Sequence, residues 1–387
     1  MTQKLFILSM LITSVIFSSC KNKATWVAKS IDTAAYQLNQ MAVEIADSSK
    51  LPRSIRNGKI RLEGIYDWTS GFFPGSLWYM YELTGTGIFK QEAAGYTALL
   101  YNLKDYRDTH DLGFMVYCSY GNGYRITGDT SYLKVMIQTA DNLISRFDSK
   151  TQTIRSWDFG KWQYPVIIDN MMNLELLFWA GEQTKNPKYR DVAIRHANTT
   201  MKNHYRANYS SYHVVDYDTI TGGVKAKGTF QGYADESAWA RGQAWGLYGY
   251  IVCYRYTKDK KYLDFAEKIA AFIMKNVKTD DKIPYWDYNA PDIPNAPRDA
   301  SAAAITASAL LELKDMVENG KEYYDYAETI LKNLSGDKYL AGKGTNKGFI
   351  LMHSVGHLPA GSEIDTPLNY ADYYYLEALK RYKQSLL

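Results

Sequence analysis

Two aspartates of this chain, Asp111 and Asp169, lie in settings that suit acid–base chemistry. Asp169 follows the apolar residues 166–168, and Asp111 stands between a histidine and the apolar segment 112–114. Carboxyl groups in apolar surroundings have raised pKa values and can hold a proton at neutral pH. An aspartate near the start of a helix is more often a helix cap. The residues alone leave both roles open.

Further polar residues and tryptophans accompany these aspartates along the chain. The polar candidates are His110, Asn170, His213, Gln231, Asp235, Glu236, Arg241, His353 and His357. The aromatic candidates are Trp68, Trp157, Trp162, Trp239 and Trp245. Arg241 stands between two of these tryptophans, which suits a clamp for a carboxylate. A buried ion pair is the alternative for this arginine.

The six histidines do not form a metal signature in the sequence. There is no H-E-x-x-H pattern, and His353 and His357 lie four residues apart in a Gly-containing segment. Hydrogen bonding to a ligand suits that segment better than zinc. No serine stands in a G-x-S-x-G elbow, so a Ser–His–Asp triad has no support. We therefore expect no metal and no other cofactor.

A repeated turn identifies the elements that must position these residues. At Thr84, Thr127, Thr184 and Thr257, a turn is followed five residues later by an aromatic residue that opens an apolar helix, and a weaker copy begins at Asn319. The segments after the turns carry apolar residues at helical spacing, and a more apolar segment precedes each turn. The pattern predicts helical hairpins about 40 to 75 residues apart.

Buried inner helices that alternate with more polar outer helices favour a closed ring. We therefore predict an all-α fold, the (α/α)6 barrel, over an open stack of hairpins. The sixth inner helix is expected at residues 370–382, and its outer partner at residues 31–48 would close the ring. Short strands are expected in the loops, for example around residues 212–217.

Counting back from the turns places four candidates at one end of this ring. Trp68, Asp111 and Arg241 lie 16 residues before their turns, and Asp169 lies 15 before its turn. Each stands roughly 24 Å from the far end of its inner helix at 1.5 Å per residue. If the inner helices run parallel, these residues meet at one mouth. Helix N-termini at such a mouth favour an anionic ligand.

The composition and the first residues predict a globular protein that leaves the cytosol. The chain has 387 residues, 46% of them hydrophobic, and no linker divides it, so we expect one domain over residues 25–387. Lys4, an apolar run and small residues predict a signal peptide over residues 1–19. Cys20 then predicts a lipidated N-terminus and attachment to a membrane in the periplasm or cell envelope. Ordinary cleavage nearby is the alternative.

The remaining composition narrows the ligand class. The net charge of +4 includes no basic stripe, which gives nucleic-acid binding no support. Aromatic rings stack on sugar faces, so the 34 Tyr and 9 Trp residues suggest a carbohydrate ligand. Cys118 and Cys253 lie in apolar helical patterns and are expected to be buried free thiols.

Five segments of the chain resemble unsaturated glucuronyl hydrolases of glycoside hydrolase family 88. They are residues 66–75, 110–114, 168–173, 235–245 and 361–365. The resemblance runs in order from about residue 60 to residue 377. It implies an (α/α)6 barrel, which agrees with the fold expected from the hairpins.

The resemblance also implies an activity and a set of site residues. The chain would remove the 4,5-unsaturated uronic acid from the non-reducing end of lyase-generated glycosaminoglycan oligosaccharides, of chondroitin, hyaluronan or heparin type. It would protonate C4 and hydrate C5 of the double bond. Asp169 would be the catalytic acid/base and Asp111 its essential partner. The implied substrate-binding residues are Trp68, His110, His213, Gln231, Trp239, Arg241, Trp245 and His353.

The sequence leaves two alternatives to this function open. A family 105-like hydrolase of unsaturated rhamnogalacturonan fragments shares the barrel and part of the segment at residues 66–75, but residues 235–245 and 361–365 are more similar to family 88. A non-catalytic sugar-binding lipoprotein would need the tryptophans and Arg241. It would not need both carboxyl groups, so their presence favours an enzyme.

Overall fold

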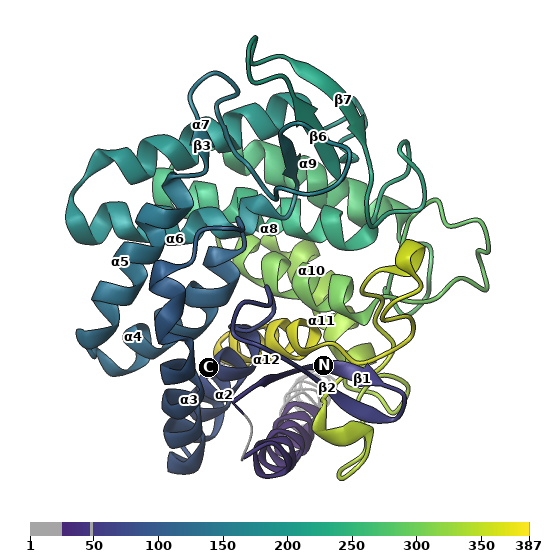
Figure 1. Cartoon of the computed structure of the whole chain (residues 1–387). Helices are drawn as coiled ribbons and strands as arrows, with labels where there is room; N and C mark the ends of the chain where they lie inside the picture. Colours follow the sequence, from purple (N-terminus) through teal and green to yellow (C-terminus); the bar gives the residue numbers. More distant parts are fainter. Residues whose placement is uncertain (1–24, 47–48, 387) are drawn as a thin grey trace, which may run out of the picture.

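The inner helices close into a ring, as Figure 1 shows for the computed structural model, which describes residues 25–46 and 49–386. Each inner helix packs on the next, and the last one packs on the first. The predicted all-α toroid is therefore confirmed. The inner elements are α2 (Phe72–Thr84), η2 (Gly113–Gly121) continued by α4 (Asn122–Thr127), α6 (Asn170–Thr184), α8 (Ala240–Thr257), α10 (Ala300–Leu313) and α12 (Asn369–Gln384).

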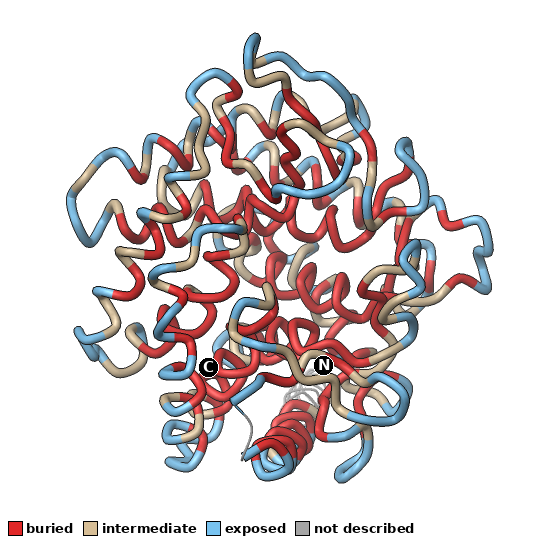
Figure 2. The backbone as a smooth tube through the Cα atoms, in the orientation of Figure 1, coloured by how far each residue is buried: buried red, intermediate tan, exposed pale blue. Residues whose placement is uncertain are grey.

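A second set of helices surrounds the inner ring. These outer elements are a helix over residues 25–44, α3 (Gly87–Leu99), α5 (Ser131–Ile144), α7 (Pro187–Asn203), α9 (Lys260–Asn276) and α11 (Gly320–Leu334). The N-terminal helix packs on α12, where the rings of Trp26 and Tyr382 lie 5.2 Å apart. This contact is the predicted closure of the ring. Figure 2 shows that the buried residues are concentrated in the inner helices and the exposed residues in the outer loops.

The four threonines of the repeated turn each end an inner helix for the same physical reason. The hydroxyl of Thr84 donates to the carbonyl four residues earlier at 2.7 Å and accepts the N–H of Thr86 at 3.2 Å. Thr127, Thr184 and Thr257 make the same pair of bonds. The residue after each threonine has left-handed backbone, which stops the helix. One side chain thus ends the inner helix and orients the first turn of the outer helix.

Short strands and 3₁₀ turns lie in the loops. The strands are β1 (Leu51–Arg56), β2 (Lys59–Glu63), β3 (Phe147–Asp148), β4 (Thr153–Ile154), β5 (Pro165–Ile167), β6 (Val214–Tyr217) and β7 (Val224–Gly228). The 3₁₀ turns are η1 (Leu100–Asp105), η3 (Asn346–Gly348) and η4 (Leu358–Ala360). Strand β6 confirms the strand expected around residues 212–217, and it pairs with both β5 and β7 in antiparallel register. The hairpin of β1 and β2 was not predicted.

Other expectations meet the described residues only in part. Cys118 and Cys253 are buried free thiols, as predicted, and burial raises the pKa of both. The expected signal peptide and Cys20 lie outside the described residues. Within the described ranges, none of the helices is both long and apolar enough to cross a membrane.

Candidate active site

A cavity of about 500 Å³ lies at the end of the ring where the inner helices begin. Its polar lining consists of Arg53, Asp67, Asp108, Thr109, His110, Asp111, Ser156, Asp169, Gln231, His357 and Glu363. Its aromatic lining consists of Tyr66, Trp68, Tyr106, Trp157, Phe159, Phe230 and Tyr370. Of the four residues that were predicted to meet at one mouth, Trp68, Asp111 and Asp169 line this cavity and Arg241 does not. A few convergent polar groups on aromatic walls are the usual composition of a small-molecule site.

Asp169 is a buried carboxyl group that does not cap its own helix. It occupies the N-cap position of α6 without a capping hydrogen bond from its side chain. Burial raises the pKa of Asp169 to about 7, while Arg241 lowers it and Asp111 raises it. Among the residues that the structure describes, none forms a hydrogen bond with the Oδ2 atom of Asp169. A carboxyl group of this kind can carry a proton near neutral pH and has an oxygen available for chemistry.

Asp111 has a similar pKa and a more polar setting. Burial raises the pKa of Asp111 to about 7. The hydroxyl of Thr109 donates to Oδ2 at 2.9 Å and opposes this rise, because it lowers the pKa. The negative charge of Asp67 raises this pKa further. His110 Nε2 lies 3.3 Å from Oδ1 of Asp111. Because burial lowers the pKa of His110 to about 3, this histidine is neutral and the contact is no ion pair.

The protonation state of His213 follows from its hydrogen bonds. Its Nδ1 atom accepts the backbone N–H groups of Phe230 at 3.0 Å and Gln231 at 3.1 Å. Nδ1 therefore carries no proton, and the hydrogen of the neutral ring is on Nε2. Burial, with Arg241 second, lowers the pKa of His213 well below its ordinary value. The imidazole is a fixed hydrogen-bond donor whose Nε2 atom faces Asp169.

Three tryptophans and one glutamine were predicted to bind the substrate. Two of these four residues line the cavity, and the other two lie in the layer behind its wall. Trp68 and Gln231 line the cavity. Trp239 and Trp245 are buried behind it, where Trp239 packs on the ring of His213 at 4.7 Å. The indole of Trp245 faces Asp169 and lowers its pKa. These two tryptophans shape the acid and its neighbour, while direct contact with a ligand stays a prediction.

Arg241 is fully buried and already has several partners. It lies over the ring of Trp239, 4.2 Å from its centroid. Its guanidinium donates to the carbonyl oxygens of Val355 and Gly356 and lies 3.3 Å from Oδ2 of Asp299. The geometry therefore favours the buried ion pair over an open carboxylate clamp. A clamp would require this arginine to exchange partners when a ligand binds.

His353 does not line the cavity. Its Nδ1 atom lies 2.6 Å from Oδ1 of Asp365, and both residues are partly exposed. The histidine of this loop that lines the cavity is His357, whose Nε2 atom lies 2.9 Å from the carbonyl oxygen of Phe230. The direction of a loop side chain depends on backbone angles, and His353 has a left-handed φ of 62°. Residue spacing alone carries no signal for such an angle.

Sequence reasoning missed an ion-pair cluster at the rim of the cavity. Arg53 donates to Oδ2 of Asp67 at 2.6 Å and to both carboxylate oxygens of Glu363 at 2.7 and 2.9 Å. Arg61 also donates to Glu363, at 3.1 Å. The cluster joins the unpredicted β1–β2 hairpin to the segment at residues 361–365. The sequence contained one signal for this cluster, because Asp67 and Glu363 each belong to a segment that resembles family 88.

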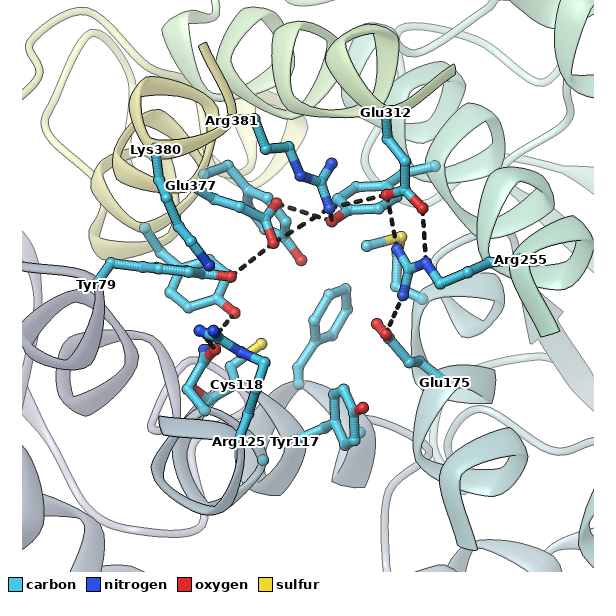
Figure 3. A pocket seen from close by; sticks show the side chains of 18 of the residues that line it. Tyr79, Tyr117, Cys118, Arg125, Glu175, Arg255, Glu312, Glu377, Lys380 and Arg381 are labelled. Carbon is cyan, nitrogen blue, oxygen red and sulfur yellow. Dashed lines mark hydrogen bonds and ion pairs between the residues drawn. The ribbon is translucent and has the colours of Figure 1, made fainter. Parts of the chain in front are cut away.

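A second cavity, of about 250 Å³, lies at the far end of the inner helices (Figure 3). Its charged residues pair with one another. Arg255 binds Glu312 at 2.6 and 2.7 Å and also pairs with Glu175. Glu377 accepts from the hydroxyl of Tyr79 at 2.7 Å. We therefore assign this cavity a structural role, because its charges are neutralised internally, whereas Asp169 retains an unpartnered oxygen.

Among the residues that the structure describes, no group of three or more His, Cys, Asp or Glu side chains is arranged to hold a metal ion. The site is instead built from the buried carboxyl group of Asp169 and the partly buried carboxyl group of Asp111, both of near-neutral pKa, together with a neutral histidine donor and aromatic walls. Such a site can perform proton transfer on a small polar ligand.

Comparison with known proteins agrees with this description. The sequence profile of Glycosyl Hydrolase Family 88 matches residues 42–383. An unsaturated glucuronyl hydrolase of Formosa agariphila is 51% identical over 325 residues, 83% of this chain and 81% of that protein. An unsaturated chondroitin disaccharide hydrolase of Streptococcus agalactiae is 37% identical over 329 residues, 82% of this chain and 81% of that protein.

A solved structure gives the same result for the fold. The crystal structure of an unsaturated glucuronyl hydrolase specific for heparin superimposes with a TM-score of 0.91 and 56% sequence identity. The match covers 93% of this chain and 98% of that chain. The chain therefore belongs to glycosyl hydrolase family 88.

Proposed function

We propose that the chain removes the terminal 4,5-unsaturated uronic acid from glycosaminoglycan oligosaccharides produced by lyases. The observation that carries this proposal is Asp169, a buried carboxyl group with a pKa of about 7 whose Oδ2 atom has no hydrogen-bond partner within residues 25–46 and 49–386. An acid that delivers a proton near neutral pH needs such a pKa. The names of the relatives support the substrate class, since they act on unsaturated glucuronyl or chondroitin units.

The proposed reaction starts at the double bond rather than at the glycosidic bond. The C4=C5 bond and the ring oxygen form an enol ether, so protonation at C4 places positive charge on C5 and the ring oxygen. The protonated Asp169 gives its proton to C4 and becomes a carboxylate. Water then adds to C5 and returns a proton to Asp169, which regenerates the acid.

The hydrated sugar then breaks down without a second carboxyl group at C1. The hydroxyl on C5 makes a hemiketal, which opens to a ketone at C5 and leaves a hemiacetal at C1. That hemiacetal expels the next sugar as an alcohol and becomes an aldehyde. Ordinary glycosidases instead use two carboxyl groups across the glycosidic bond. In this chain Asp111 is proposed to hold the sugar hydroxyl groups and to favour the protonated form of Asp169 by its negative charge.

An assay of purified protein on lyase-made disaccharides tests this function. We propose heparin-type disaccharides as the first substrates, because the heparin-specific structure is 56% identical over 93% of the chain. Chondroitin and hyaluronan disaccharides complete the panel. The ultraviolet absorbance of the double bond should disappear while the second sugar is released, and matched saturated disaccharides should remain intact. Equal release of saturated glucuronic acid would contradict the proposal.

We also propose that the chain is exported and lipid-anchored through Cys20. The basic residue, the apolar run and the small residues before this cysteine support the proposal. Expression with a labelled fatty acid should label the wild type but not Cys20→Ser, and fractionation should release the variant from the membrane. Equal labelling of both proteins would contradict lipidation at Cys20.

A further inference from the structure

The side chain of Asn173 joins the two helices that carry the candidate catalytic aspartates. Asn173 is fully buried on α6, four residues after Asp169. Its Oδ1 atom accepts the backbone N–H of Phe114, three residues after Asp111, at 2.8 Å. Its Nδ2 atom lies 3.4 Å from the carbonyl oxygen of Asp169. One amide group therefore contacts the first turns of both helices.

The backbone of η2 is adapted to this contact. A Cβ atom added to Gly113 would lie 2.6 Å from Cα and 2.9 Å from the carbonyl oxygen of Asn173, so only glycine allows the two helices to approach this closely. The N–H of Phe114 bonds to Asn173 and not within its own helix, and residues Gly113–Gly121 continue as a π-helix. π-helical segments are rare and occur frequently at functional sites. The close approach fixes the position of Asp111 relative to α6.

The amide of Asn173 also acts on the charge of Asp111. Together with Thr109, it lowers the pKa of Asp111 against the effect of burial. The main groups that shift the pKa of Asp169 in addition to burial are Arg241, Asp111 and Trp245. The other charged or titratable groups that face the two carboxyl groups are Asp67, Tyr106, His110, Arg146, His213 and Arg241. A donor directed at one carboxyl group of a close pair favours negative charge on that group.

We propose that Asn173 is a positioning residue that sets the spacing of the two aspartates and keeps negative charge on Asp111 and the proton on Asp169. The proposal rests on the proposed function, because only an acid at Asp169 makes this assignment useful. The amide suits the task because its oxygen accepts the N–H of Phe114, while its NH₂ group faces the carbonyl oxygen of Asp169 and acts on the carboxyl group of Asp111. Asn173→Asp keeps an oxygen for Phe114 but lacks the N–H group that favours the Asp111 anion. Asn173→Leu removes both functions at similar volume.

The order in which the two carboxyl groups ionise tests the proposal without substrate. The full chain is labelled with ¹³C at the aspartate carboxyl carbons, and the two signals are assigned with Asp111→Asn and Asp169→Asn. In the wild type, Asp111 should ionise at lower pH than Asp169. In Asn173→Leu, which removes the N–H group without adding a charge, the titration of Asp111 should move up by about one pH unit, the usual effect of one charged hydrogen bond. Earlier ionisation of Asp169 in the wild type would overturn the proposal.

Activity measurements separate positioning from a structural role. Asn173→Asp and Asn173→Leu should lower kcat by about 10- to 100-fold with little change in KM, since small displacements of a catalytic group have effects of this size. Asn122→Leu is the matched control, because Asn122 is a buried asparagine that bonds Tyr373 at the far end of the ring. It should lower thermal stability but leave kcat and both titrations unchanged.

The outcomes keep this inference distinct from the proposed function. A folded Asn173 variant with wild-type kcat and an unmoved Asp111 titration would overturn the positioning role. Should Asn173→Leu fail to fold, Asn173→Asp and the wild-type ionisation order decide the question. A wild type that leaves unsaturated disaccharides intact would contradict the function alone, because the ionisation order is measured in the free protein.

Discussion

The Nε2 atom of His213 lies 3.7 Å from Oδ2 of Asp169. This distance is too long for a hydrogen bond, and the neutral ring carries its hydrogen on this nitrogen. His213 is therefore ready to donate to the carboxylate that Asp169 becomes after losing its proton, but it cannot accept that proton. A small movement during turnover would complete the bond. Asp169 is therefore the acid, and His213 is the neighbour that stabilises its anion.

The tautomer of His213 should be visible by NMR. Labelling the histidines with ¹⁵N and assigning His213 with His213→Gln should show a protonated Nε2 and an unprotonated Nδ1 from pH 5 to pH 8. The two backbone N–H groups on Nδ1 are the physical reason. A His213 ring that titrates near pH 6.5, the ordinary value for histidine, would contradict this assignment.

Asp169→Asn should nearly abolish turnover while the fold is kept. The amide cannot deliver a proton to C4, and loss of a general acid costs about 10²-fold or more. Asp111→Asn should be similarly severe if Asp111 holds the sugar and the negative charge. Steady-state kinetics beside thermal unfolding would measure both variants. A folded Asp169→Asn protein with near-wild-type activity would refute the role of Asp169.

The activity should have a bell-shaped dependence on pH. Asp169 must be protonated and Asp111 ionised, and burial raises the pKa of both to about 7. Activity should therefore fall as the pH rises above this region, where Asp169 loses its proton, and also as the pH falls below it, where Asp111 gains one. The two limbs belong to the pair rather than to single residues. Activity that stays constant across this range would exclude the assignment.

Asp372 should make folding stability fall as the pH rises. This buried carboxyl accepts the backbone N–H groups of Ile350 and Leu351 at 2.9 and 2.8 Å, yet burial raises its pKa to about 7. The folded state therefore holds its proton more tightly than the unfolded state, in which the pKa is about 3.9. Between these values one group removes about 1.4 kcal/mol of stability per pH unit. Urea unfolding at several pH values should show that the free energy of unfolding falls less steeply with pH in Asp372→Asn than in the wild type. Equal slopes for the two proteins would contradict the prediction.

Arg241→Ala should lower stability as well as activity. Removing one partner of a buried ion pair costs about 3 to 5 kcal/mol, because the remaining charge, here Asp299, stays buried. Thermal unfolding measures this loss. Methyl-esterified and free-acid unsaturated substrates then separate the two roles of Arg241. The ion pair predicts the same relative loss of activity on both, whereas a loss confined to the charged substrate would restore the carboxylate clamp.

The predictable parts of this molecule are those controlled by local chemistry. Thr84 and Thr257 marked helix ends because their hydroxyl groups bond within four residues along the chain. Periodic apolar residues then predicted the inner and outer helices. Counting back from the turns predicted that Asp111 and Asp169 lie at one mouth of the ring, because they occupy equivalent places in consecutive hairpins.

The parts that escaped prediction depend on distant segments. Arg53 and Glu363 are bonded across 310 positions of sequence. For Arg241 the sequence favoured a carboxylate clamp and left a buried ion pair as the alternative, because its partners include carbonyl oxygens 114 and 115 positions away, whose direction depends on loop backbone. Asn173 belongs to a family-like segment, yet its role became evident only when Phe114 was placed beside it. Local patterns predict elements and their ends, but not which buried groups satisfy one another.

Hydrolysis in D₂O tests whether Asp169 delivers a proton to C4. If Asp169 protonates C4, the released uronic acid must carry one solvent deuterium at C4 and no C4=C5 bond. Mass spectrometry and NMR of product collected early, before the neighbouring ketone exchanges hydrogens, would locate this label. Every product molecule of the wild type should carry one deuterium at C4, and Asp169→Asn should give no such product. A released sugar that retains its double bond and has no deuterium at C4 would contradict the mechanism.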